Sequence, residues 1–521
     1  MKPSATPRRL LHEALLEHGA DPARARHTAV VVEGRAYSYA QLLDTASRLA
    51  GALAERGVGR GDRVAIYMDN TWPCVVAVFA TLLAGGVFLV VNPLTKSDKL
   101  GFVLDDSGAR VLLSDGHLAH EFVPLLGTRP ALRVIASGGL PDRCAIEAFD
   151  AVIEAAAPLC ERPATIALDL AALIYTSGST GMPKGVMHTH QSMLFAAQSL
   201  IQYLRLGEGE RILCTLPLAF DYGLYQWLMA VQLGATLVLE RSFAFPAQVF
   251  ARMHAFEVTV FPGVPTVFAM LLSAHRRERL CFPSVTRVTN TAAALPDEQA
   301  LKLREIFPSA LLYKMYGLTE CKRVCYLEPE LMEAKPGSVG KAIPGTEVFL
   351  RSVAGGPVAP GEAGILHVRG PHVMLGYWNR PDLSAQMLRE GPLPGERVLC
   401  THDWFRMDEE GFLYFVGRSD DIIKTRGEKV SPVEVENVLH AVEGVREAAV
   451  VGVPDELLGE AIRAYVVLES GVSLGVGQIR AYCMRRLESF MVPQQILLCM
   501  DLPRTATGKV SRKALLEQPP A

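Results

Sequence analysis

Short apolar runs alternate with longer stretches of helical character through the first part of the chain. The runs RVAIYM at 63–68 and GVFLVV at 86–91 have the length and apolar content of buried strands. Between and beside them lie stretches such as YAQLLDTASRLAGALAERG at 39–57 and WPCVVAVFATLLAGG at 72–86. A chain that alternates in this way buries its apolar surface best as helices packed on a largely parallel sheet. We therefore predict a multi-layer α/β fold.

The pattern changes twice towards the carboxyl end. From about 352 to 418, short strands separated by Gly/Pro turns predict a β-rich subdomain with antiparallel strands. After the segment GRSDD, the order becomes helix (VEVENVLHAV), strands (REAAVVGVPD and RAYVVLES) and helix (IRAYCMRRLESF). We expect an N-terminal body over 1–419 and a small, mobile α+β C-terminal domain over 420–521.

Composition excludes several classes of protein. The 521 residues carry a formal net charge of -3, and the pI of about 6.5 gives no basic excess for nucleic acid. No apolar run has the length of a membrane helix, and the amino-terminal segment lacks the apolar core of a signal peptide. The ten cysteines form no C-x-x-C pair. We expect a cytoplasmic protein with reduced thiols, no nucleic-acid partner and no membrane span, while its oligomeric state stays open.

A glycine- and hydroxyl-rich loop follows the apolar run LAALI. Its sequence, YTSGSTGMPKGVMHTH at 175–190, combines glycines that free the backbone with hydroxyl donors and the mobile charge of Lys184. Such a loop at a strand end is suited to binding phosphate. The spacing is not that of a Walker loop, so the nucleotide stays unproven at this point, and a surface linker is the alternative. The hydroxyl and glycine members are Thr176, Ser177, Gly178, Ser179 and Thr180.

Several ordered motifs resemble the adenylate-forming superfamily, which comprises acyl-CoA synthetases, adenylation domains of nonribosomal peptide synthesis, and luciferases. They are the loop above, YGLTE at 316–320, GILHVRGPHVMLGYW, THDWFRMDEEGFLYFVGRSDD and PRTATGKVSRKAL, and together they span about 30–515. The resemblance implies two steps: a carboxylate attacks the α-phosphate of ATP to give an acyl adenylate, and a thiol then displaces AMP. A nucleotide sensor or a luciferase-like oxygenase are the other classes that would share some of these motifs.

The resemblance assigns the catalytic residues. Lys509 matches the lysine that reaches both the carboxylate and the α-phosphate, where one cation would quench the repulsion between two anions. Glu320 matches the carboxylate that holds Mg²⁺, which prefers hard oxygen ligands and bridges substrate phosphates. Thr319 matches the hydroxyl beside the α-phosphate. The alternatives are a solvated tail lysine and a surface glutamate.

The nucleoside is assigned to four further residues. The resemblance implies that Tyr316 and Gly317 lie against the adenine and that Asp403 and Arg418 contact the ribose hydroxyls. The family usually has Thr-Gly-Asp where this chain has Thr401-His402-Asp403, so His402 is a departure. A carboxylate that accepts hydrogen bonds from paired hydroxyls remains chemically sensible.

The acid is less well specified, and Asp221 is the position that matters most. Amino-acid-activating relatives carry Phe-Asp at Phe220 and Asp221, where the aspartate pairs with the substrate ammonium, so one hypothesis is a substrate with an amine. The alternative is that Asp221 is the N-cap of the helix that begins at YGLYQWLMA. The residues that the resemblance places in the acyl pocket are Phe220, Asp221, Phe261, Gly263, Val264 and Ala292.

The last expectations concern the second half-reaction. Asp420 resembles the hinge about which the C-terminal domain rotates between the two steps, and an acidic linker is the alternative. Arg426 and Gly427 lie where relatives pass the pantetheine thiol. The acceptor is CoA or the phosphopantetheine of a free acyl carrier protein. We expect an AMP-forming acid–thiol ligase of the acyl-CoA synthetase type that uses ATP and Mg²⁺, with an amino-acid-adenylating enzyme serving a separate carrier protein as the alternative.

Overall fold

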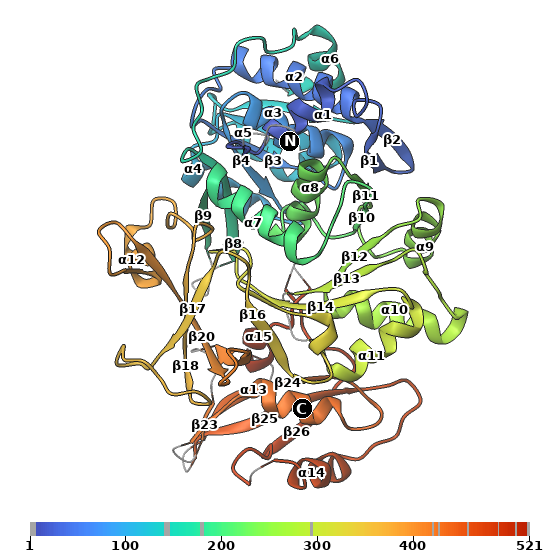
Figure 1. Cartoon of the computed structure of the whole chain (residues 1–521), viewed down its shortest axis with the longest axis vertical. Helices are drawn as coiled ribbons and strands as arrows, with labels where there is room; N and C mark the ends of the chain where they lie inside the picture. Colours follow the sequence, from blue (N-terminus) through green and yellow to red (C-terminus); the bar gives the residue numbers. More distant parts are fainter. Residues whose placement is uncertain are drawn as a thin grey trace, which may run out of the picture.

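The computed structural model describes residues 7–139, 146–177, 182–291, 295–418, 421, 423–425, 428–455, 458–487, 489–505 and 508–517. Its N-terminal body contains two large sheets with helices packed between and around them (Figure 1). The first sheet has the strand order β7-β6-β5-β3-β4-β8-β9. Its strands are parallel except for the β8–β9 hairpin. The bounds are β3 (Arg63–Tyr67), β4 (Val87–Val91), β5 (Val111–Asp115), β6 (Arg133–Ser137), β7 (Ile146–Ala148), β8 (Leu170–Ser177) and β9 (Pro183–Thr189).

The second sheet is half parallel and half antiparallel. Its parallel half runs β14-β13-β12-β10-β11-β1, and β2 is added antiparallel at the edge. These strands are β1 (Thr28–Val32), β2 (Arg35–Ser38), β10 (Arg211–Cys214), β11 (Thr236–Leu239), β12 (Val260–Gly263), β13 (Arg287–Asn290) and β14 (Leu311–Tyr316). The predicted α/β architecture with largely parallel strands is confirmed.

The antiparallel half contains the predicted β-rich region. It runs β15-β16-β21-β20-β18-β17, and β19 pairs with β20. Because β15 pairs with β14, this region continues the parallel sheet and starts before 352. Its strands are β15 (Cys325–Leu327), β16 (Ser338–Ala342), β17 (Glu347–Arg351), β18 (Ala363–Arg369), β19 (Leu388–Glu390), β20 (Arg397–Met407) and β21 (Leu413–Arg418).

Two helices of the body are buried on nearly every side, because their sequences are apolar all round. They are α3 (Trp72–Leu83) and α8 (Asp221–Leu233). The other helices of the body show polar outer faces: α1 (Glu13–Ala20), α2 (Tyr39–Glu55), α4 (Ser97–Ser107), α5 (Ala119–Leu126), α6 (Phe149–Ala155), α7 (His190–Tyr203), α9 (Pro246–Ala255), α10 (Pro265–Glu278), α11 (Asp297–Ile306) and α12 (Pro381–Met387). Single 3₁₀ turns lie at Gly116–Leu118 and Pro329–Leu331. A search of the described helices finds none with the length and hydropathy needed to cross a bilayer.

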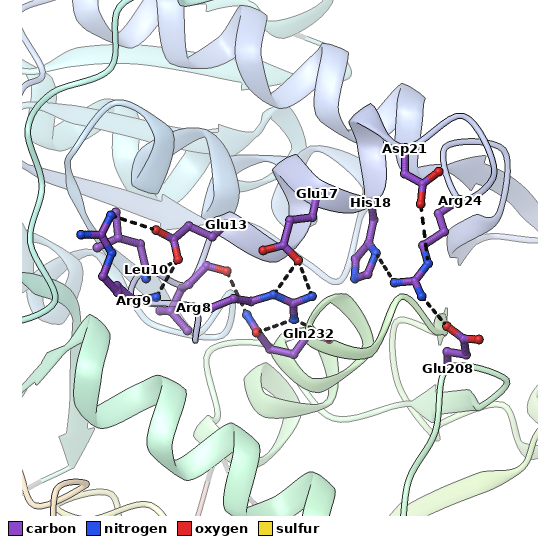
Figure 2. A network of polar contacts seen from close by, with 11 residues as sticks. Arg8, Arg9, Leu10, Glu13, Glu17, His18, Asp21, Arg24, Glu208 and Gln232 are labelled. Atoms are coloured by element: carbon purple, nitrogen blue, oxygen red, sulfur yellow. Dashed lines mark hydrogen bonds and ion pairs between the residues drawn. The ribbon is translucent and has the colours of Figure 1, made fainter. Parts of the chain in front are cut away.

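An ion-pair network ties the amino-terminal segment to the end of α8 (Figure 2). The Arg8 guanidinium donates to the Gln232 backbone oxygen at 2.6 Å and to Glu17 at 2.7 Å. Arg24 reaches Glu208 at 3.0 Å. The Arg8–Gln232 contact holds the last turn of α8. The first residue of this helix is Asp221, a predicted pocket residue.

The C-terminal region has its own sheet and core. Its strands β22 (Ile423–Thr425), β23 (Glu428–Val430), β24 (Val445–Asp455), β25 (Gly459–Leu468) and β26 (Gln495–Leu498) are ordered β23-β22-β25-β24, with β26 on β25. The helices α13 (Pro432–His440), α14 (Val476–Met484) and α15 (Arg512–Glu517) accompany them. A separate cluster of buried apolar residues that includes Val435, Ile462 and Ile479 fills the space between them. The C-terminal region contacts the body where Ser431 donates to the Val416 carbonyl oxygen and where Arg276 pairs with Glu469 at 2.9 Å.

Candidate active site

The glycine-rich loop connects β8 and β9, two antiparallel strands, rather than a strand and a helix. In this hairpin Thr176 lies directly opposite Lys184. The predicted phosphate ligands Gly178, Ser179 and Thr180 and the side chain of Ser177 lie outside the described part of the chain. The Thr176 hydroxyl is buried, and no partner for it occurs among the described residues. Because β8 ends at Ser177 and β9 begins at Pro183, the glycine-rich segment follows the end of a strand, as expected.

Glu320 is held by a tyrosine and a lysine from two other elements. The Tyr377 hydroxyl donates to Glu320 Oε1 at 2.5 Å and accepts a hydrogen bond from Lys184 Nζ at 2.9 Å. Lys184 Nζ is 3.9 Å from the same carboxylate oxygen. Burial, together with Glu320, raises the pKa of Tyr377, so its hydroxyl keeps its proton. Sequence reasoning missed Tyr377, although it lies in the quoted motif GYW.

The backbone beside Glu320 is held by a buried histidine. His188 Nε2 lies 2.8 Å from the Thr319 carbonyl oxygen and donates to it. Burial lowers the pKa of His188, so the ring is neutral near neutral pH. Gly317 allows the chain to turn tightly here, because a Cβ at this position would lie 2.4 Å from the Lys322 carbonyl oxygen. These contacts set the direction of Thr319 and Glu320.

Tyr316, Asp403 and Arg418 lie together as the resemblance implied. Asp403 and Arg418 are directly opposite each other on β20 and β21, and Arg418 Nε is 3.4 Å from the Asp403 carboxylate. The Tyr316 hydroxyl donates to the same carboxylate. Burial raises the pKa of Asp403, and the positive charge of Arg418 opposes that shift. The three residues form a polar edge that is suited to paired hydroxyls.

The departure at His402 has a backbone explanation. His402 has a φ of 57°, in the left-handed region where glycine is favoured. The glycine that the family usually has at this position is therefore explained by conformation. Here the histidine adopts the same turn, and the Asp403 N–H donates to Thr401 Oγ1 at 3.1 Å. The departure leaves the position of Asp403 intact.

Asp221 is not the N-cap of α8, so that interpretation was wrong. The N-cap is Phe220, and no side chain caps the helix. Asp221 is the first helical residue, and its carboxylate lies 3.5 Å from Lys322 Nζ. The side chain turns towards this lysine instead of towards the free N–H groups of its own helix.

Lys322 is the counter-charge that sequence reasoning missed. Its side chain is 2% exposed, and its Nζ lies 4.3 Å from the centre of the Tyr225 ring. Burial lowers the pKa of Lys322 to about 7, and Asp221 opposes the shift. The available signal was its place in the sequence, since Cys321, Lys322 and Arg323 directly follow YGLTE.

The remaining acyl-pocket residues divide into two groups. Phe261 is fully buried among Phe243, Phe268 and Phe307, so it is part of the core, and its assignment to the pocket wall stays a prediction. Gly263 and Val264 lie where β12 leads into α10, and a Cβ on Gly263 would lie 2.5 Å from the Phe268 ring. Phe220 is partly buried beside the core. Ala292 lies outside the described residues.

Lys509 belongs to the C-terminal region and lies within reach of the charges of Asp221, Asp403 and Glu320. Its backbone is held by Thr505, whose N–H donates to the Lys509 carbonyl oxygen at 2.7 Å. A Cβ on Gly508 would be 3.5 Å from Thr266 Oγ1 at the start of α10. Lys509 keeps contact with solvent, yet desolvation by the surrounding protein lowers its pKa, as does Arg418. Asp221, Asp403 and Glu320 oppose that shift, because their negative charges favour the protonated lysine. The predicted hinge Asp420 and the thiol-passage residues Arg426 and Gly427 lie outside the described residues.

Comparisons with known proteins agree with this geometry. The AMP-binding enzyme family matches residues 16–378, and the AMP-binding enzyme C-terminal domain matches 434–509. A long-chain-fatty-acid–CoA ligase of Bacillus subtilis (strain 168) is 32% identical over 94% of this chain and 91% of its own length. A feruloyl-CoA synthase of Amycolatopsis sp is 34% identical over 93% of this chain and 94% of its own length.

A solved structure shares the whole architecture. An anthranilate CoA ligase in complex with anthranoyl-AMP superimposes with a TM-score of 0.90 and 28% sequence identity, covering 99% of this chain and 98% of that one. The fold, the matched domains and the relatives support the same two-step reaction: ATP converts a carboxylic acid to an acyl-AMP, and a thiol then takes the acyl group. The chain belongs to the AMP-binding enzyme family and is an adenylate-forming ligase of the acyl-CoA synthetase type.

Proposed function

We propose that this enzyme forms an acyl-CoA with Lys509 as the cation that bridges the substrate carboxylate and the α-phosphate of ATP. The observation that carries this proposal is that the chain at Gly508 lies against Thr266 of the body, so that the charges of Asp221, Glu320 and Asp403 oppose the lowering of the Lys509 pKa. The cation comes from the C-terminal region, and the anions that would surround the substrates come from the body.

The physical need for this cation follows from the reaction. A carboxylate and a triphosphate repel each other, and negative charge builds on the α-phosphate oxygens as the new bond forms. A positioned cation lowers the cost of bringing the two anions together and stabilises the charge that develops. When the C–O–P linkage forms, the bond from the α-phosphorus to pyrophosphate breaks, and pyrophosphate leaves with the electron pair.

Glu320 fits a metal ion that arrives with the nucleotide. Mg²⁺ keeps several waters and takes one or two protein carboxylates along with phosphate oxygens. Glu320 offers one carboxylate, while Tyr377 and Lys184 hold its Oε1 and leave capacity for a further partner. A Mg²⁺ ion bound there would neutralise phosphate charge. Thr319, whose backbone is held by His188, would present its hydroxyl beside the α-phosphate.

Tyr316, Gly317, Asp403 and Arg418 would bind the nucleoside. The Asp403 carboxylate already accepts from Tyr316 and lies beside Arg418. A carboxylate oriented by two donors can accept hydrogen bonds from the ribose hydroxyls in a defined direction. Lys184 and the hydroxyl-rich loop after β8 would contact the outer phosphates.

CoA is the acceptor that the relatives support, because both named enzymes are CoA ligases or CoA synthases. We propose that rotation of the C-terminal region about Asp420 withdraws Lys509 and admits the thiol past Arg426 and Gly427. The thiolate then attacks the acyl carbonyl, the bond to AMP breaks, and AMP leaves with the electron pair. The acid itself would be aliphatic or aromatic, as in the fatty-acid and feruloyl relatives.

The test is the variant Lys509→Met, assayed with a panel of carboxylic acids. We expect ATP–pyrophosphate exchange to fall by about 10²- to 10³-fold, the range for losing one transition-state charge contact. Thioester formation from a supplied acyl-AMP should fall much less, because that step needs no cation between two substrates. The matched control is Lys513→Met, which removes an exposed lysine of α15. Exchange at the rate of the parent enzyme in Lys509→Met would refute the assigned role.

A further inference from the structure

A buried ion pair lies beside the catalytic charges, and the proposed reaction does not use it. The carboxylate of Asp221 and the Nζ of Lys322 are 3.5 Å apart, with side chains 10% and 2% exposed. Asp221 begins α8, whereas Lys322 lies in the turn between β14 and β15. Two chain segments a hundred residues apart in sequence therefore meet to pair these charges at the predicted acyl pocket.

We propose that Lys322 occupies, as an internal counter-ion, the position at Asp221 that a substrate ammonium would otherwise take, so that the enzyme selects carboxylic acids without a basic amine beside the carboxyl group. This inference rests on the proposed function, because it places Asp221 in the acyl pocket. Lys322 acts on the acid through Asp221 and is therefore a positioning residue for specificity.

Charge balance is the first argument. The Asp221 carboxylate is paired with the Lys322 ammonium 3.5 Å away, and Lys509 would be paired with the carboxylate of the acid. These charges cancel. An added ammonium would bring a further cation into a region where Arg323, 3% exposed, also lies. An uncompensated charge in a desolvated site is expensive, so amines are disfavoured.

The second argument is that Lys322 is fixed in place. Its φ is 62°, a left-handed conformation that a residue with a side chain rarely adopts. The next residue is anchored, since Arg323 donates to Thr291 Oγ1 at 2.7 Å. The ammonium lies over the Tyr225 ring, and no hydrogen-bond partner for it is found among the described residues. The ammonium thus has the Asp221 carboxylate as its compensating charge.

The third argument is the surroundings of Asp221. It is the first helical residue of α8 and makes no capping hydrogen bond. Phe220, which precedes it in the chain, is partly buried and supplies aromatic surface beside it, whereas Tyr222 and Tyr225 are buried in the core. An aromatic or aliphatic acid can pack on such surface without a charged partner. A neutral aromatic amine falls outside the exclusion, because it carries no charge at neutral pH.

The experiment compares pairs of acids that differ by one ammonium group, such as 3-phenylpropionate with phenylalanine and hexanoate with norleucine. The readout is kcat/KM for ATP–pyrophosphate exchange, expressed as the ratio of the amino acid to its amine-free counterpart. The variants are Lys322→Met, Asp221→Asn, the double variant and the charge-keeping Lys322→Arg. The matched control is Lys341→Met, an exposed lysine whose Nζ lies 4.4 Å from the centre of the Phe412 ring.

The expected order of the ratio, from lowest to highest, is Asp221→Asn, parent, double variant, Lys322→Met. Lys322→Met should raise the ratio at least ~10-fold, equivalent to about 1.4 kcal/mol, and Lys322→Arg should return it towards the parent value. A parent enzyme that activates the amino acid as well as its counterpart would overturn the proposal. So would a folded Lys322→Met enzyme with an unchanged ratio.

Lys322→Met leaves a buried carboxylate unpaired and can fail to fold. The double variant then decides the matter, because it removes both charges, and a ratio equal to that of the parent would overturn the proposal. Failure of the underlying function looks different: no acid would support exchange in the parent, or Lys509→Met would leave exchange intact. The ratio of amino acid to amine-free acid is compared only in a parent enzyme that supports exchange, so an unchanged ratio is distinct from both of these failures.

Discussion

Asp403 is a buried carboxylate whose orientation depends on two neighbouring side chains. Arg418 supplies a positive charge 3.4 Å away, and the Tyr316 hydroxyl supplies a hydrogen bond. Hydrogen bonds to charged groups contribute about 1.5–3 kcal/mol, more than bonds between neutral groups. The tyrosine is therefore expected to matter through the carboxylate that it orients, in addition to any contact with adenine.

Tyr316→Phe is expected to raise the KM for ATP by about tenfold, since one charge-assisted hydrogen bond to the nucleoside-binding carboxylate is lost. The KM for the acid should change by less than about twofold because Asp403 faces the nucleoside. The measurement is steady-state exchange at varied ATP and varied acid. Tyr326→Phe is the control, since its hydroxyl donates to Glu328 at 2.7 Å, outside the proposed site. An unchanged KM for ATP in Tyr316→Phe would contradict the assignment.

Between elements, buried histidines join the amino-terminal segment to α7. The rings of His12 and His190 lie 5.9 Å apart edge to face, and the Leu11 N–H donates to His190 Nδ1 at 3.2 Å. Desolvation lowers the pKa of His12 to about 4 and that of His190 to about 3. Both rings are neutral in the native state at neutral pH.

The fold should therefore lose stability in mild acid. Each folded pKa lies below the unfolded value of about 6.5, so the unfolded chain binds protons first as the pH falls. The contribution is fully present above the unfolded pKa and decreases from about pH 6.5 down towards the folded values. Between pH 7 and pH 5.5 we expect a loss of about 1 kcal/mol for each histidine. His12→Gln should reduce the fall in unfolding midpoint over this range.

The control for this measurement is His254→Gln, because His254 is an exposed residue at the end of α9. Removing it should leave the pH dependence of the parent protein unchanged. A His12→Gln protein with the same fall in midpoint as the parent would mean that His12 does not titrate across unfolding.

Across the whole molecule, the C-terminal region lies against the body (Figure 1), and the charges of Asp221, Asp403 and Glu320 of the body act on Lys509. One of its contacts with the body is the pair of Arg276 on α10 and Glu469 after β25, 2.9 Å apart. Such surface pairs contribute little, about 0–1 kcal/mol, so they do not prevent rotation. A loosely held domain is what alternation between two half-reactions needs.

Tethering the C-terminal region in this arrangement should separate the two half-reactions. Arg276→Cys/Glu469→Cys, made in a background where the exposed Cys160 and Cys281 are changed to serine, would be joined with a short bismaleimide. We expect pyrophosphate exchange to stay within about threefold and acyl-CoA formation to fall at least ~10-fold, because the thiol cannot enter while Lys509 occupies the site. The single-cysteine variants, treated with the same reagent, are the controls. Acyl-CoA formation that continues after complete cross-linking would exclude rotation.

Much of the architecture could be predicted because it depends on local pattern. The apolar runs at 63–68 and 86–91 became β3 and β4, and the Gly/Pro-punctuated stretch after 352 became antiparallel strands. Period and turn chemistry are carried by neighbouring residues, so one sequence suffices to read them. The sequence did not predict how strands from distant segments join. The β-rich region is continuous with the parallel sheet, because β15 pairs with β14.

The candidate site was predictable where a motif holds its own residues together, as in Tyr316, Thr319 and Glu320. It was not predictable where partners come from elsewhere in the chain. Tyr377 bonds to Glu320, and Lys322 pairs with Asp221 across a hundred positions. The sequence cannot tell whether Phe261 lines a pocket, because an apolar residue beside a pocket and one inside a core have the same sequence signature, and in the structure it is buried.

The amino-acid sequence by itself determined the layered α/β body and the family of reactions, because those follow from short-range pattern and from motifs, and it named the residues that are proposed to carry the chemistry. Only the tertiary structure decided how the charges are paired. Electrostatic energy depends on distance through space and on burial, and neither quantity is encoded in the spacing along the chain. The same Asp221 could be read as a helix cap or as an ammonium site until the fold brought the buried Lys322 to within 3.5 Å of it.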